Sequence, residues 1–323
     1  MLFKAAKKAR FEFFAYDFVV GAVLASVIAA FTLGSWDTHD LTFQDNFILI
    51  GVRKMIVAFA AGAVASAANV VLLGSVAVGG MAVGFPIAFA VSSVVLAVWI
   101  QITLPGANPV LSIGGAAAAL IAVVVCAIAY HNYLAAQRVS QALVDPKKTS
   151  SQSGKTAKAI VLAILAGLLL SAFFLLLARA TSPETGLAPY SAALVISAGM
   201  FFASLLIIPL FLNFPVKGQP LTVTRYFKIE KRHHIFGVLA GIIWMAGLLA
   251  GLASDNIPAG IQPSPVAAFI LSRSVPVVAL FWGLFIWREM AGAPARVYTM
   301  MAAFVVLYLV GIGMLAAAPM YGR

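Results

Sequence analysis

The stretch AFILSRSVPVVALFWGLFIW, residues 268–287, places one arginine in a long run of apolar residues. Apart from Ser272, Arg273 and Ser274, every residue in it is apolar or small. A guanidinium stays charged in proteins, so Arg273 needs hydrogen-bond partners or water wherever it lies. The meaning of this arginine therefore depends on whether the surrounding chain is soluble or membrane-embedded.

The composition is that of an integral membrane protein. Of the 323 residues 63% are hydrophobic and 10% are charged, with a mean hydropathy of +1.04. Soluble domains are about half apolar and about a quarter charged, so this chain has too little polar surface to cover itself in water. The single cysteine, Cys126, excludes an intrachain disulfide and lies in an apolar run.

The apolar segments have the length of helices. A membrane-spanning helix needs about 20 apolar residues, whereas barrel strands alternate over about 10. The sequence predicts an all-α bundle with nine transmembrane helices, at about 12–34, 55–77, 81–103, 110–136, 158–180, 190–213, 235–254, 263–287 and 294–317.

The basic residues predict the orientation. The net charge is +11, and most Lys and Arg residues fall before the first span and in the loops after the fourth, sixth and eighth spans. Cytoplasmic loops collect such residues, which explains the charge without a nucleic-acid partner. We expect an inner (plasma) membrane protein with a cytoplasmic N-terminus and central loop and an external C-terminus.

The spans form two related sets. FAAGAVASAANVVLLGSV (59–76) resembles LAGIIWMAGLLAGLASDN (239–256), and AFAVSS (88–93) aligns with AFILSR (268–273). We expect a first repeat over 1–136, a polar linker over 137–157 and a five-helix repeat over 158–323. The first repeat has only four spans, so we expect a five-plus-five plan whose first helix is lost or misassigned. Repeats of five helices are inverted in the membrane, as in many secondary transporters.

Five segments have recognisable patterns of small and aromatic residues: RFEFFAYDF (10–18), AILAGLLLSAFFLLLARATSP (163–183), GLAPYSAAL (186–194), HHIFGVLAGIIWMAGLLAGLAS (233–254) and AFILSRSVPVVALFWGLFIWREM (268–290). Through these segments the chain resembles the drug/metabolite transporter superfamily, in its ureide permease-like and sugar porter branch. The resemblance implies ten helices in inverted repeats and a permease for small polar solutes, either sugars or nitrogen-rich heterocycles such as ureides and nucleobases.

Arg273 is the leading candidate for solute binding because charged residues inside a membrane normally face the bundle interior. We expect it in a water-accessible cavity; the alternative is a structural hydrogen-bonding hub. Ser272 and Ser274 flank it, and Ser92 and Ser93 occupy the aligned positions of the first repeat. These serines contact solute or allow close helix packing.

Three further residues are candidates for contact with a planar polar solute. Asn69 and Ser66 lie three residues apart on one helix face, and Trp244 occupies the matching span. The alternative for Asn69 and Trp244 is helix packing. Proline frees a carbonyl and kinks a helix, so the predicted hinges, or alternatively tolerated kinks, are Pro86, Pro265 and Pro276.

Asp17 is the carboxylate best placed to enter a span, as a coupling residue or as an interfacial residue like Glu12, Asp255 and Glu289. His233 and His234 are predicted to belong to a basic membrane-edge cluster. We predict no catalytic constellation, metal site or cofactor, because no paired acids or His/Cys clusters occur.

The sequence therefore predicts a permease that moves a small polar solute by alternating access. The alternative is a non-transporting scaffold or receptor, or a truncated, decayed carrier. The expected partners are the solute and the lipid bilayer, with a homo-oligomer as an open alternative.

Overall fold

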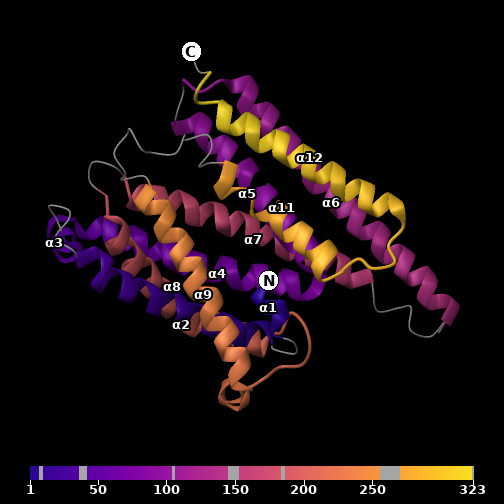
Figure 1. The fold of residues 1–323 in the computed structure, drawn as a ribbon, viewed down its shortest axis with the longest axis horizontal. Helices are drawn as coiled ribbons and strands as arrows, with labels where there is room; N and C mark the ends of the chain where they lie inside the picture. The colour runs from indigo at the N-terminus through magenta and orange to yellow at the C-terminus, as the bar shows by residue number, and fades with distance from the viewer. Residues whose placement is uncertain are drawn as a thin grey trace. The chain divides into compact units, whose positions relative to one another are not determined.

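The computed structural model describes residues 1–6, 10–35, 42–103, 106–144, 153–182, 186–254 and 270–321. All regular elements in these ranges are helical (Figure 1). The α-helices are α1 (Leu2–Ala5), α2 (Phe11–Phe31), α3 (Phe43–Leu49), α4 (Val52–Gly79), α5 (Met81–Thr103), α6 (Pro109–Val144), α7 (Ser153–Ala180), α8 (Pro189–Asn213), α9 (Lys231–Ser254), α11 (Val275–Phe281) and α12 (Ala295–Ala317). Two 3-10 helices, η1 (Leu33–Ser35) and η3 (Val223–Lys228), and a π-helical segment, η4 (Trp282–Ile286), complete the described elements.

Eight helices in the described ranges are long and apolar enough to cross a membrane: α2, α4, α5, α6, α7, α8, α9 and α12. They match eight of the predicted spans. A long apolar run forms a helix in a membrane because a helix satisfies its own backbone hydrogen bonds where no water is present. The remaining predicted span, 263–287, is described only from residue 270. There the structure has a shorter apolar helix, 275–286, so the ninth spanning helix stays a prediction.

The polar segment predicted as a linker is helical at both of its ends. Helix α6 continues to Val144, and α7 begins at Ser153. Gln, Ala, Leu and Arg are good helix formers, which favours the extension of α6 through residues 137–144. The intervening residues 145–152, like Pro265 and Asp255, lie outside the described ranges.

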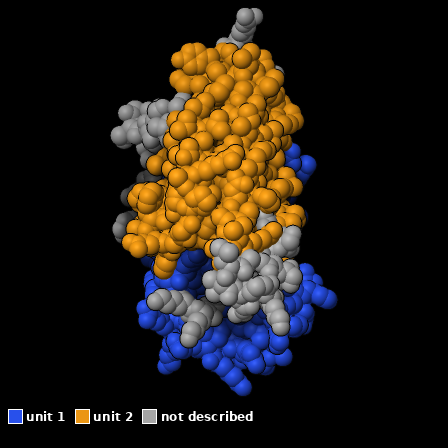
Figure 2. Space-filling view, turned by 90° about the vertical axis from the view of Figure 1, so that its right-hand side faces the viewer, with its two compact units in different colours: residues 1–70, 172–262 blue, residues 71–171, 263–323 orange. Residues whose placement is uncertain are grey.

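The chain forms two compact units (Figure 2). The first comprises residues 1–70 and 172–262, and the second comprises 71–171 and 263–323. The division falls within α4 and within α7. The predicted repeats, 1–136 and 158–323, follow the order of the sequence instead, and they stay a prediction.

Small residues bring helices into backbone contact in the first unit. A Cβ atom on Gly21 of α2 would overlap the backbone of Val238, and one on Gly241 of α9 would overlap the backbone of Phe18. A Cβ atom on Gly62 of α4 would likewise overlap the backbone of Ile196 in α8. Close approach at small residues is how helices pack where lipid removes the hydrophobic driving force.

The glycine contacts give a stability prediction. Gly241→Ala should lower the unfolding free energy by about 1–3 kcal/mol, because its methyl group meets backbone that cannot rotate away. Gly247→Ala on the same helix is the control, since nothing lies within 4 Å of its Cβ position. Melting temperatures of the detergent-solubilised variants measure the difference. Equal melting temperatures would contradict the packing.

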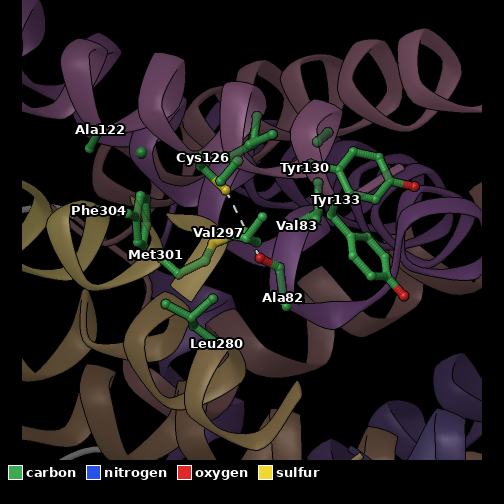
Figure 3. Packing of buried hydrophobic residues seen from close by; sticks show 14 of the residues in the cluster. Ala82, Val83, Ala122, Cys126, Tyr130, Tyr133, Leu280, Val297, Met301 and Phe304 are labelled. Atoms are coloured by element: carbon green, nitrogen blue, oxygen red, sulfur yellow. Dashed lines mark hydrogen bonds between the residues drawn. The ribbon is translucent and has the colours of Figure 1, made fainter. Parts of the chain in front are cut away.

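The core of the second unit contains the cysteine. Cys126 of α6 lies among Ala82, Val83, Met301 and Phe304, which come from α5 and α12 (Figure 3). Its thiol Sγ is 4.0 Å from the carbonyl oxygen of Ala82. The thiol is thus a packed, weakly hydrogen-bonding group.

Candidate functional site

Arg273 lies where a helix is interrupted. The helical turn that is described from residue 270 ends at 272, and α11 begins at Val275, with Pro276 in its first turn. Proline favours the first helical positions and has no amide to donate to the preceding turn. The interruption therefore follows from the SRSVP sequence, and it places Arg273 between two helical segments.

The Arg273 side chain points into the second unit. It is 6% exposed, and its Nη1 donates to the Ser92 hydroxyl of α5 across 3.2 Å. The Arg273 carbonyl oxygen accepts a hydrogen bond of 3.0 Å from the hydroxyl of Tyr308 on α12. Two helices therefore fix both the side chain and the backbone of Arg273.

The other predicted serines have different surroundings. Ser93 is buried, donates to the Phe89 carbonyl across 2.9 Å and lies beside the Tyr308 hydroxyl. Ser274 donates to the Leu271 carbonyl across 2.7 Å, and Ser272 is exposed. Of the four serines predicted around Arg273, Ser92 has a described hydrogen bond to the guanidinium.

The remaining predicted solute contacts belong to the first unit. Asn69 donates to Ala65 of its own helix across 2.9 Å, and the Ser66 hydroxyl is buried with no hydrogen-bond partner among the described residues. Trp244 packs against Phe18 and Phe173, with ring centroids 5.7 and 6.1 Å away. The contacts of Asn69 and Trp244 are those of helix packing. Solute binding by this group stays a prediction.

The two described hinge candidates, Pro86 and Pro276, occupy different helical positions. Pro276 starts α11, whereas Pro86 lies inside α5. Because Pro86 has no amide hydrogen, the Ala82 carbonyl one turn earlier lacks its usual helical donor, and the Cys126 thiol approaches that oxygen. Hinge motion at either proline stays a prediction.

A second polar cluster surrounds Asp17 in the first unit. The Asp17 side chain is almost fully buried, and its carboxylate accepts a hydrogen bond from the Tyr226 hydroxyl of η3. His234 of α9 places Nδ1 2.9 and 3.0 Å from the two carboxylate oxygens. Burial, followed by the hydrogen bond to Asp17 and its charge, raises the pKa of Tyr226 well above its usual value, so the phenol stays protonated.

This cluster is not among the predicted sites. His234 is predicted to belong to a basic membrane-edge cluster, and its side chain contacts Asp17 where α2 and α9 approach closely at Gly21, Gly237 and Gly241. The signal that could have found it is the Gly spacing at 21, 237 and 241, which predicts a close helix pair. Asp17 is thus a hydrogen-bonded buried carboxylate, whether or not it also serves in coupling.

Glu289 is predicted to be an interfacial residue, and the structure shows which groups its carboxylate contacts. Its carboxylate accepts hydrogen bonds from the backbone amides of Met81 and Ala82, at 2.9 and 2.8 Å. It therefore caps the first turn of α5, the helix that carries Ser92. Acceptors and negative charge are both favourable at a helix N-terminus.

Comparison with known proteins gives distant relatives. Ureide permease 1 of Arabidopsis thaliana is 23% identical over 129 residues, which are 40% of this chain and 32% of the relative. Ureide permease 5 of the same plant is 30% identical over 73 residues, covering 23% of this chain and 18% of the relative. The chain thus spans about a third or less of the length of these relatives. No protein-family model and no solved structure matches it.

The fold and these similarities together define a class. The chain is a multi-pass helical membrane protein with permease-like similarity, and its relatives carry the names of transporters rather than of enzymes.

Proposed function

We propose that this protein is a permease of the drug/metabolite transporter superfamily, in the ureide permease-like and sugar porter branch. Its solute is a small polar molecule, either a sugar or a heterocycle of the ureide and nucleobase type. Two inverted repeats, over 1–136 and 158–323, alternate access to the solute between the two sides of the membrane.

The observation that carries this proposal is the position of Arg273 in an interrupted helix. Secondary transporters bind solutes at discontinuous helices, where freed backbone groups and charged side chains meet. A buried arginine is costly in a membrane and marks a functional site by default. Its planar donors suit carbonyl oxygens or vicinal hydroxyls, which are groups that ureides, nucleobases and sugars carry.

Two further parts of the proposal rest on charge. The basic segments favour a cytoplasmic N-terminus and an external C-terminus in the inner (plasma) membrane. Asp17 is the candidate coupling residue, since it is a buried carboxylate hydrogen-bonded to two titratable side chains, Tyr226 and His234.

Counterflow in proteoliposomes tests the proposal. Purified protein is reconstituted into vesicles preloaded with one member of a panel of sugars, ureides and nucleobases. The same radiolabelled compound is then added outside. We expect saturable accumulation with at least one compound and none in protein-free vesicles. Should no panel member accumulate, a non-transporting scaffold or receptor becomes the better conclusion.

A further inference from the structure

The backbone around Arg273 departs from regular helical hydrogen bonding. In an uninterrupted helix the amide of Val277 would donate to the carbonyl of residue 273. Here Val277 donates instead to Ser274, across 3.0 Å, and Pro276 has no amide hydrogen. The Arg273 carbonyl thus needs a donor from another part of the chain.

Tyr308 supplies that donor. It is completely buried, and its hydroxyl lies 3.0 Å from the Arg273 carbonyl oxygen. Its ring stacks on Phe304, with centroids 5.6 Å apart and an angle of 10° between the planes. The ring belongs to α12, a continuous helix from Ala295 to Ala317. The continuous helix α12 therefore holds the Tyr308 hydroxyl in place against the Arg273 carbonyl.

Arg273 is held at two ends. Ser92 of α5 accepts from the guanidinium, and Tyr308 of α12 donates to the carbonyl of the same residue. If the carbonyl lost its donor, the break could relax by rotating the peptide groups on either side of Arg273. The guanidinium would then leave its position beside Ser92, because a side chain follows the backbone that carries it.

We propose that Tyr308 is a positioning residue for solute binding: its hydroxyl fixes the interrupted backbone at Arg273 and so aims the guanidinium. This inference rests on the proposed function, in which Arg273 binds the solute. Tyr308 itself need not touch the solute. Its role is to keep Arg273 arranged before the solute arrives, which lowers the ordering cost of binding.

The chain provides a matched control for the hydroxyl. Tyr298 also lies on α12, and its hydroxyl also donates to a backbone carbonyl, that of Met290, across 2.9 Å. The variants Tyr308→Phe and Tyr298→Phe therefore remove the same group from the same helix. Only the first removes the donor to Arg273.

Two measurements on the full-length protein test the inference. In counterflow we expect Tyr308→Phe to raise KM at least fivefold with little change in maximal rate, whereas Tyr298→Phe leaves KM unchanged. In detergent, hydrogen exchange followed by mass spectrometry should be faster for peptides covering residues 270–281 in Tyr308→Phe, but not in Tyr298→Phe. The double variant Arg273→Ala/Tyr308→Phe should have the KM of Arg273→Ala. Tyr308 acts through the Arg273 guanidinium, so its hydroxyl has no further effect once the guanidinium is removed.

The outcomes separate this inference from the proposed function. Faster exchange with a raised KM supports a positioning role. Faster exchange with an unchanged KM overturns it and makes Tyr308 an architectural residue, and unchanged exchange overturns it as well. If the wild-type protein moves no panel compound, the proposed function fails. The exchange comparison then decides by itself whether Tyr308 fixes the backbone at Arg273.

Discussion

Replacing Arg273 with alanine should weaken solute binding more than tenfold, which is about 1.4 kcal/mol. Arg273 is 6% exposed, so a solute that reaches it would form charge-assisted hydrogen bonds with little competition from water. Removing it takes away charge and donors together. The KM of counterflow in proteoliposomes measures the loss, and the yield of monodisperse protein reports folding.

Arg273→Lys separates charge from geometry. Lysine keeps the positive charge but lacks the planar pair of donors, so we expect transport to fall sharply while the protein still folds and inserts. Arg296→Ala is the control, because that arginine is exposed near the start of α12. If both Arg273 variants transport with wild-type KM, Arg273 is a packing residue and the proposed site is wrong.

The eight described helices that are long and apolar enough to cross a membrane could be predicted because each one is a local property of the sequence. An apolar run of sufficient length forms a helix in lipid whatever its neighbours are, since its backbone must be satisfied internally. Span 81–103 was predicted with the bounds of α5, which begins at Met81 beside Gly80, a glycine with a φ of +89°. That conformation favours glycine and ends the preceding helix there.

The partners of the candidate residues could not be predicted in the same way. Ser92 was identified from its alignment with the Arg273 segment, and the structure brings the two together. Tyr308 had no such signal, because a tyrosine in an apolar helix has the same pattern whether it packs or donates a hydrogen bond. His234 and Tyr226 reach Asp17 from more than 200 positions along the chain. Only the tertiary arrangement determines such contacts.

The broken helix shows where an apolar pattern gives incomplete information. Residues 263–287 have the length and composition of one span, yet the chain from 270 onward contains a turn, the seven-residue α11 and the π-helical segment η4. Pro276 explains the start of α11. The length and mean hydropathy of a segment do not reveal such interruptions. At an interruption, backbone polar groups lose their helical partners and become available for binding.

Replacing Glu289 with alanine should produce the largest loss of stability outside the solute site, about 3 kcal/mol. The carboxylate accepts two charge-assisted hydrogen bonds from the amides of Met81 and Ala82, which are themselves buried. Each such bond contributes about 1.5–3 kcal/mol, and both amides would lose their acceptor together. We expect a clear decrease in the melting temperature of Glu289→Ala in detergent.

Glu289→Gln tests whether charge or shape is responsible. The amide side chain keeps one acceptor oxygen and loses the negative charge that favours a helix N-terminus. The loss of unfolding free energy in Glu289→Gln should therefore be about half of that in Glu289→Ala. Glu230→Ala, at an exposed carboxylate just before α9, should leave the melting temperature unchanged. A Glu289→Ala protein as stable as Glu230→Ala would contradict the capping role. Helix α5 also carries Ser92, which contacts Arg273. The Glu289 variants should therefore lose solute affinity only if α5 shifts, and the KM of Glu289→Gln measures that effect.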